Sequence, residues 1–372
     1  MRFHLTGRIR SAAFLGSVAM LAACVPSARA PQPVPPVAKG PVQRVPAPTP
    51  PPAPAPYRNP AAERPAPGLV AEIDELWRNF PGTTGIAVRR IDGDWSFGKR
   101  QDELFPQQSV SKTWVSLTIL DEVDKGRIKL SDPVTIGVND LAVFHQPIRD
   151  RVIANGSVTE TVYSLIQQAI TRSDNTANDA LLWKAGGPDA VNAFIRDKGL
   201  GAIRFGPGER LLQSKIAGLT WNQDYAIGRR FYAARAELPV ETRRAALYDY
   251  LRDPMDGASP QAIVDALGKL ARGELLSPES TRLMLETMER THSGPNRLKA
   301  GVPDGWDFLH KTGTGQELGG IATGYNDIGI MTAPDGTRYA VAVMLGDTTA
   351  SIPARMRLMQ SVTRAVARYH GM

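Results

Sequence analysis

Two serine–lysine pairs in this chain have a spacing that could serve nucleophilic catalysis, and only one of them can cooperate. Ser109 and Lys112 stand in FPQQSVSKTWVSLTIL, whereas Ser96 and Lys99 stand in DWSFGKR. The apolar pattern from Val110 onward predicts a helix, on which residues three apart are neighbours on one face. The segment around Ser96 predicts a strand, on which residues three apart face opposite sides of the sheet.

The predicted place of Ser109 at a helix start also favours it as the nucleophile. Backbone N–H groups and the helix dipole at such a position stabilise developing negative charge. Ser111 lies in the same segment but points roughly to the other side of the helix, so it is not expected to contact Lys112.

Three short motifs follow one another along the chain and together resemble one known set. They are Ser109-Val110-Ser111-Lys112, Ser173-Asp174-Asn175 and Lys311-Thr312-Gly313. Class A β-lactamases and penicillin-binding proteins carry S-x-x-K, S-D-N and K-T-G in this order. The segments SDNTANDALL, GGPDAVNAFIRDKG and RLKAGVPDGWDFLHKTGTG extend the likeness. Through most of residues 70–372 the chain therefore resembles the class A serine β-lactamase family.

The resemblance implies a role for each motif in opening a β-lactam ring. Ser109 would attack the carbonyl carbon and form an acyl-enzyme. Lys112 would take or relay the proton of Ser109, and Ser173 would pass a proton toward the departing ring nitrogen. The backbone N–H groups of Ser109 and Thr314 would form the oxyanion hole.

The same resemblance implies a set of substrate-binding residues. Asn175 would hold the acylamido side chain of the substrate, and Phe144 falls where the family has a gating aromatic residue. The substrate carboxylate would be bound by residues of the K-T-G segment with help from a nearby arginine, namely Lys311, Thr312, Gly313, Thr314 and Arg297.

Hydrolysis of the acyl-enzyme requires a further base, which the family supplies from an E-x-x-L-N segment. Here the matching residues are Glu209-Arg210-Leu211-Leu212-Gln213. Glu209 would activate the deacylating water together with Gln213. Whether the glutamate or Lys112 takes the proton of Ser109 during acylation is left open by the resemblance.

The departures from the family pattern cluster around this segment. Gln213 is one methylene longer than the asparagine of the family. Pro207 replaces an arginine that pairs with an aspartate in many members, so Asp256 is expected to lack its usual partner. Residues 214–255 form an extra insertion, predicted to contain two amphipathic helices. The insertion could brace the segment that carries Glu209, cover the active site or bind a partner.

The helices and strands that are predicted to carry these residues indicate an α+β fold. Alternating apolar residues predict strands near both ends of the domain, with hairpin turns at Asp92-Gly93 and Asp335-Gly336. Residues 127–300 read as mostly helical, and further helices are expected over 71–80 and 353–369. The pattern indicates an antiparallel sheet flanked by helices, with an inserted all-helical subdomain, as in the β-lactamase/transpeptidase-like fold.

The first residues predict an export signal and a lipid anchor. Residues 1–23 have a basic start and an apolar run too short to remain as a membrane helix. The run ends in Leu-Ala-Ala-Cys, which resembles a bacterial lipobox and makes Cys24 the expected lipidation site. An ordinary cleavage site at residues 28–30 is the alternative, although Pro31 after the cut disfavours it.

Residues 24–67 are predicted to be a disordered tether, because residues 31–67 hold 15 of the 30 prolines. Residues 68–372 are predicted to form the catalytic domain. The resulting expectation is a periplasm-facing membrane lipoprotein of a Gram-negative bacterium. Val25 after the cysteine favours the outer membrane, close to peptidoglycan.

Composition and charge limit which partners and cofactors this protein is expected to bind. The net charge is +7, but no lysine- or arginine-rich block is long enough to indicate nucleic acid binding. The five histidines show no zinc-ligand spacing, so neither a metal nor another cofactor is expected.

Three functions remain open at this stage. A β-lactamase, with a small β-lactam as substrate, fits all the motifs. A penicillin-binding D-alanyl-D-alanine peptidase would use the same scaffold without needing Glu209. A catalytically idle cell-wall-binding lipoprotein would need none of Ser109, Lys112 and Glu209, so their joint presence disfavours it.

We predict that Cys24→Ala releases the protein from the membrane fraction, because no other segment of the sequence is apolar and long enough to anchor it. Fractionation and immunoblotting of cells expressing either form would measure this. A mutant protein that still sediments with membranes would contradict the lipobox interpretation.

Overall fold

The computed structural model describes residues 64–93 and 95–372. The predicted signal peptide, Cys24 and residues 24–63 of the predicted tether lie outside these ranges. Within them, no helix is both long and apolar enough to cross a membrane.

The centre of the fold is a five-stranded antiparallel sheet in the order β2-β1-β11-β10-β7. Its strands come from both ends of the domain, as predicted. They are β1 (Thr84–Arg90), β2 (Ser96–Lys99), β7 (Asp307–Thr314), β10 (Tyr325–Thr332) and β11 (Arg338–Leu345). The predicted hairpins β1–β2 and β10–β11 are both present.

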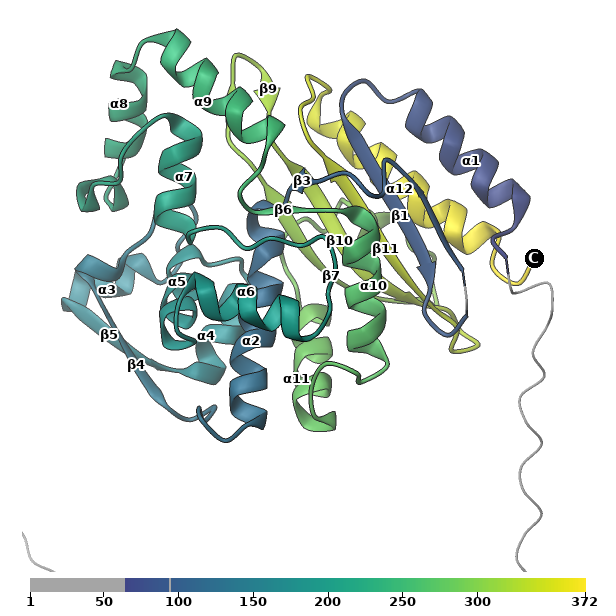
Figure 1. Cartoon of the computed structure of the whole chain (residues 1–372), viewed down its shortest axis with the longest axis horizontal. Helices are drawn as coiled ribbons and strands as arrows, with labels where there is room; N and C mark the ends of the chain where they lie inside the picture. Colours follow the sequence, from purple (N-terminus) through teal and green to yellow (C-terminus); the bar gives the residue numbers. More distant parts are fainter. Residues whose placement is uncertain (1–63, 94) are drawn as a thin grey trace, which may run out of the picture. The chain divides into compact units, whose positions relative to one another are not determined.

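Helices cover both faces of this sheet because its strands are apolar on both sides (Figure 1). On one face, helices α1 (Pro67–Arg78) and α12 (Ile352–Arg368) pack on side chains such as Ile86 and Val341. On the other face, α10 (Pro260–Ala271) packs on alternate positions such as Ala87 and Ala342.

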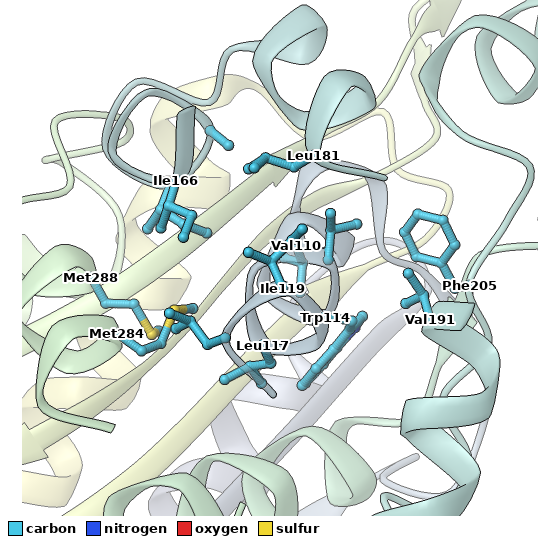
Figure 2. Close-up of a cluster of buried hydrophobic side chains, with 14 of the residues drawn as sticks. Val110, Trp114, Leu117, Ile119, Ile166, Leu181, Val191, Phe205, Met284 and Met288 are labelled. Atoms are coloured by element: carbon cyan, nitrogen blue, oxygen red, sulfur yellow. The ribbon is translucent and has the colours of Figure 1, made fainter. Parts of the chain in front are cut away.

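Helix α2 (Lys112–Asp124) is the axis of the second layer. All residues from Lys112 to Asp121 are buried, so this helix is surrounded on every side. Figure 2 shows Trp114, Leu117 and Ile119 of α2 at the centre of an apolar cluster. The surrounding helices include α4 (Val162–Thr171), α5 (Asn175–Lys184), α6 (Pro188–Asp197) and α11 (Pro278–Glu289). The residue at the start of α2 is thereby fixed in place.

The α+β fold class is confirmed, with one refinement in the helical part. This part also contains an antiparallel pair of strands, β4 (Pro133–Gly137) and β5 (Ser157–Thr161), whose connection includes the short helix α3 (Arg149–Asn155). Helix α4 begins directly after β5, at Val162, where the Thr161 hydroxyl caps it. Two pairs of two-residue strands contribute less: β3 (Phe105–Pro106) pairs with β6 (Gly257–Ala258), and β8 (Glu317–Leu318) pairs with β9 (Ile321–Ala322).

The predicted insertion contains the two expected helices, α8 (Arg230–Glu237) and α9 (Val240–Arg252), after a 3₁₀ turn at Gln223–Ala226. Helix α7 (Glu209–Ala217) also runs into it and ends at Gly218, which has the left-handed backbone typical of a helix terminus. The α7 side chains Leu212 and Ile216 pack against Tyr250 of α9. The insertion thus folds back onto the helix that begins with Glu209 (Figure 1).

Candidate active site

Ser109 lies in a single 3₁₀ turn, Gln108–Ser111, that leads directly into α2. Lys112 Nζ donates a hydrogen bond to Ser109 Oγ at 2.9 Å. The hydroxyl of Ser111 points elsewhere and donates to the Gln108 carbonyl at 2.8 Å. The structure therefore brings together the pair that sequence spacing selected.

The other serine–lysine pair is separated, as predicted for a strand. Lys99 forms an ion pair with Asp74 of α1. Ser96 accepts a hydrogen bond from Gln261 of α10 at 3.0 Å. The two side chains have different partners on different helices.

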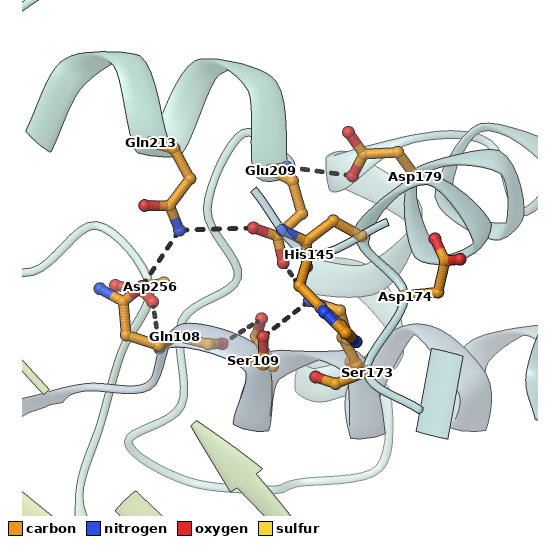
Figure 3. A network of polar contacts seen from close by, with 12 residues as sticks. Gln108, Ser109, His145, Ser173, Asp174, Asp179, Glu209, Gln213 and Asp256 are labelled. Atoms are coloured by element: carbon orange, nitrogen blue, oxygen red, sulfur yellow. Dashed lines mark hydrogen bonds and ion pairs between the residues drawn. The ribbon is translucent and has the colours of Figure 1, made fainter. Parts of the chain in front are cut away.

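Lys112 also forms a buried ion pair with the carboxylate of Glu209. The lysine side chain is 0% exposed and the glutamate side chain 5% exposed. Glu209 is the first residue of α7, and its backbone N–H donates to Asp179 Oδ1 of α5 at 3.0 Å. Ser109 and Glu209, both labelled in Figure 3, are thus connected through the ammonium group of Lys112.

The longer side chain of Gln213 still reaches the glutamate. Its Nε2 lies 3.1 Å from Gln108 Oε1 and 3.4 Å from Glu209 Oε2. The other end of the carboxamide is held because Gln316 Nε2 donates to Gln213 Oε1 at 3.0 Å. With glutamine in place of the asparagine of the family, the contact with Glu209 is kept, as the dashed line between Gln213 and Glu209 in Figure 3 shows.

Ser173 and Lys311 form the second half of the site. Lys311 Nζ donates to Ser173 Oγ at 2.9 Å and to the Thr312 carbonyl at 2.8 Å. Burial, together with the charges of Lys112 and Arg297, holds the pKa of Lys311 well below its usual range. An anion beside Lys311 would relieve this repulsion.

Two further predicted binding residues, Thr312 and Asn175, are held by hydrogen bonds within the protein. The hydroxyl groups of Thr312 and Ser293 lie 2.7 Å apart and form a hydrogen bond. Asn175 Nδ2 donates to the Val143 carbonyl at 2.8 Å, so it fixes the loop that carries Phe144.

Arg297 is buried, and its two terminal nitrogens are engaged with protein groups, while its Nε has no hydrogen-bond partner. It donates to the carbonyls of Gly313 and Asn326 at 2.8 and 2.6 Å, and to Thr314 Oγ1 at 2.6 Å. Its guanidinium lies 3.8 Å from the centre of the Tyr325 ring, and burial lowers its pKa. These contacts position the end of β7 and add positive charge behind it.

Gly313 is required by the approach of two segments. A Cβ atom at this position would lie 2.3 Å from the Gln107 carbonyl oxygen, which no side chain can tolerate without a shift of the backbone. The glycine of the K-T-G motif therefore lets β7 lie against the residues that precede the nucleophile.

Backbone strain is concentrated around the same place. Among the described residues, four non-glycine residues have positive φ, and three of them border the site: Gln108 (54°), Phe144 (64°) and Ser173 (57°). Such conformations are costly for residues with a Cβ and persist where surrounding contacts enforce them.

Asp256 is not left without a partner, because the insertion supplies one. Its Oδ1 accepts a hydrogen bond from the Tyr250 hydroxyl at 2.8 Å, and its Oδ2 accepts from the backbone N–H of Gln108 at 2.8 Å. Gln108 Nε2 in turn donates to the Tyr250 hydroxyl at 2.7 Å. A tyrosine of α9 thus occupies the role predicted for the missing arginine.

Two buried carboxyl groups next to the site have raised pKa values. Burial raises the pKa of Asp256 to about 6, although hydrogen bonds from Tyr250 and Gln108 oppose the shift. Burial and the charge of Glu209 raise the pKa of Asp179 to about 6.

Sequence reasoning did not single out several residues that hold the site together. Gln108 and Gln316 adjoin the motifs, directly before Ser109 and two residues after Thr314, and this adjacency was the available signal. Tyr250 and Asp179 carry no comparable signal, because their contacts join segments far apart in the sequence.

Comparisons with known proteins agree with this geometry. Residues 68–370 match the model of the beta-lactamase enzyme family. The chain is 28% identical over 299 residues to a beta-lactamase of Rhodobacter capsulatus, covering 80% of this chain and 85% of the relative. It is 24% identical over 307 residues to beta-lactamase VEB-1 of Pseudomonas aeruginosa, covering 81% and 90%. The crystal structure of the TLA-1 extended spectrum beta-lactamase superposes with a TM-score of 0.67 at 26% identity, covering 81% of this chain and 99% of that one.

The chain therefore belongs to the beta-lactamase enzyme family. Its relatives and structural neighbours make it a class A-like hydrolase, as the sequence resemblance implied.

We predict that Asp256→Asn changes the pH dependence of stability. The pKa of Asp256 is raised from 3.8 to about 6 in the folded protein, so folding favours the protonated carboxyl. Its favourable contribution to the free energy of unfolding is therefore fully present below pH 3.8 and is lost as the pH rises through about 6. Relative to the mutant, the wild type should lose up to about 3 kcal/mol of unfolding free energy between about pH 4 and 7, with no further change above.

Urea unfolding of both proteins from pH 4 to 8 would measure this difference. Asp249→Asn is the matched control, because it removes a carboxyl of α9 that is 70% exposed. A difference between wild type and Asp256→Asn that stays constant with pH would show that Asp256 does not titrate in this range.

Proposed function

We propose that this protein hydrolyses β-lactams through an acyl-enzyme on Ser109 and that Glu209 activates the water that releases it. The observation that carries the proposal is the position of Lys112 Nζ, which contacts both Ser109 Oγ and the Glu209 carboxylate. Nucleophile and deacylation base are thus coupled through one buried group.

In acylation, Ser109 Oγ attacks the lactam carbonyl carbon and the ring C–N bond breaks. The hydroxyl proton leaves through Lys112 or Glu209, both of which lie within reach of the same hydrogen-bonded chain. Ser173 delivers a proton to the departing nitrogen, a role supported by its hydrogen bond to Lys311. The oxyanion is received by the backbone N–H groups of Ser109 and Thr314.

Substrate binding relies on the positive end of β7. Lys311 with Thr312 and Thr314 binds the carboxylate of the β-lactam, and Arg297 reinforces it through Thr314. Asn175 holds the acylamido group, and Phe144 borders the entrance.

In deacylation, water attacks the ester carbon of the acyl-enzyme, its proton passes to Glu209, and Ser109 recovers a proton as the bond to its oxygen breaks. Gln213 supports this step, since its carboxamide contacts Glu209 and is fixed by Gln316. We further propose, from the sequence, that the enzyme works facing the periplasm, anchored through a lipid on Cys24.

We expect Ser109→Ala to abolish covalent labelling by a fluorescent penicillin, because the attacking oxygen is removed. Ser96→Ala and Ser111→Ala should still label, since neither hydroxyl contacts Lys112. Gel fluorescence and mass spectrometry would compare the three variants. Labelling that survives the loss of Ser109 would rule out its assignment as nucleophile.

We expect Glu209→Gln to accumulate the acyl-enzyme. Glutamine keeps the volume of the side chain but cannot accept the proton of water, and a general base contributes about 10²–10⁴ in rate. Turnover of benzylpenicillin should fall by about that factor, and a protein heavier by the whole drug should persist in mass spectra.

Glu241→Gln, which changes an exposed carboxyl of α9, is the control for loss of one negative charge. Unchanged turnover in Glu209→Gln would exclude this residue as the deacylation base. A wild-type protein that itself retains the adduct for hours would favour the peptidase alternative.

A further inference from the structure

A cavity of about 380 Å³ lies where the insertion meets the active site. Its lining comes from α7, α8 and the segment after β7, and includes Phe144, Gln213, Tyr232, Arg235, Thr314 and Glu317. Two of these residues belong to the proposed machinery: Gln213 contacts the Glu209 carboxylate, and Thr314 ends the strand that carries Lys311. The cavity therefore adjoins residues that are proposed to act on the substrate.

Packing between aromatic rings fixes the side of the cavity that α8 forms. Phe231 is 1% exposed, and its ring meets the ring of Phe144 edge-on with centroids 4.9 Å apart. The ring of Tyr232 lies 5.6 Å from the same phenylalanine. Arg235 follows Tyr232 by three residues and so lies on the same face of α8.

Arg235 is a half-buried cation whose hydrogen-bonding capacity is largely unused. Its Nη2 donates to the Glu317 carbonyl at 3.0 Å, while its buried Nε has no partner. No carboxylate in the described part of the chain forms an ion pair with Arg235.

The groups around Arg235 do not neutralise it. The carboxylate of Glu317 is directed to Arg355, with Oε1 at 3.0 Å from Nη1. Burial and the nearby charge of Arg243 lower the pKa of Arg235, yet a guanidinium remains protonated at neutral pH. An unpaired, partly desolvated cation of this kind is stabilised by an incoming anion.

We propose that Arg235 is a specificity-determining residue that selects β-lactams whose acyl side chain carries a second carboxylate. This rests on the proposed function. The rings of Phe144 and Tyr232 contact the aryl or alkyl part of the side chain, and the guanidinium of Arg235 receives its carboxylate. The insertion thereby adds to the active site a subsite that discriminates substrates by the charge of their acyl side chain.

Benzylpenicillin and its α-carboxy and α-amino derivatives test this, because they share one scaffold and differ in the α substituent, which is neutral, negative or positive. The measurement is kcat/KM for each drug with wild type, Arg235→Gln and Arg235→Lys. For Arg235→Gln, we expect the ratio of kcat/KM for the α-carboxy drug to that for benzylpenicillin to fall about tenfold, as one charge-assisted contact is lost. The corresponding ratio for the α-amino drug should rise, and Arg235→Lys should restore part of the preference.

Arg230→Gln is the matched control on the same helix. Arg230 is 60% exposed, pairs with Asp224 at 3.1 Å and does not line the cavity. Its loss should leave the ratios among the three drugs unchanged, and thermal unfolding would confirm that each variant is folded.

Equal changes for all three drugs in Arg235→Gln would overturn the proposal and leave the β-lactamase function standing. An identical shift in Arg230→Gln would also overturn it, because the effect would then come from overall charge. Failure of the wild type to hydrolyse any of the three drugs would refute the proposed function and this inference with it.

Discussion

The buried ion pair between Lys112 and Glu209 is the constraint on which the site depends. Removing two charges from water costs several kcal/mol per ion, so such a pair persists only where geometry and further hydrogen bonds compensate. Here Ser109 accepts from the ammonium group, and Asp179 holds the backbone at Glu209. Helices α2, α5 and α7 must therefore converge at one point, and the apolar cluster around α2 provides the rigidity for this (Figure 2).

A second constraint is the concentration of positive charge at β7. Lys112 and Arg297 lie close enough to Lys311 that their charges lower the affinity of Lys311 for its proton, with burial as the larger cause. The protein supports this arrangement with carbonyl oxygens rather than with carboxylates. The nearby carboxylates of Glu209 and Asp327 offset this positive field only in part, so it is available to a substrate anion.

The sequence was sufficient to predict the fold class and the contacts between residues of the same motif. Spacing alone separated Ser109 and Lys112 from Ser96 and Lys99, because helix and strand place residues three apart differently. Contacts between distant segments could not be predicted in this way. The hydrogen bond from Tyr250 to Asp256 depends on how α9 packs, and the strand pair β4–β5 depends on pairing that local propensity shows only weakly.

The insertion is attached to the catalytic groups at both of its ends. Helix α7 starts with Glu209 and leads into the insertion, and α9 returns through Tyr250 to Asp256 and Gln108, next to the nucleophile. Such a segment cannot open independently while the active site stays ordered. The insertion and the catalytic centre should therefore behave as one cooperative unit in hydrogen exchange, so that local unfolding of either one inactivates the enzyme.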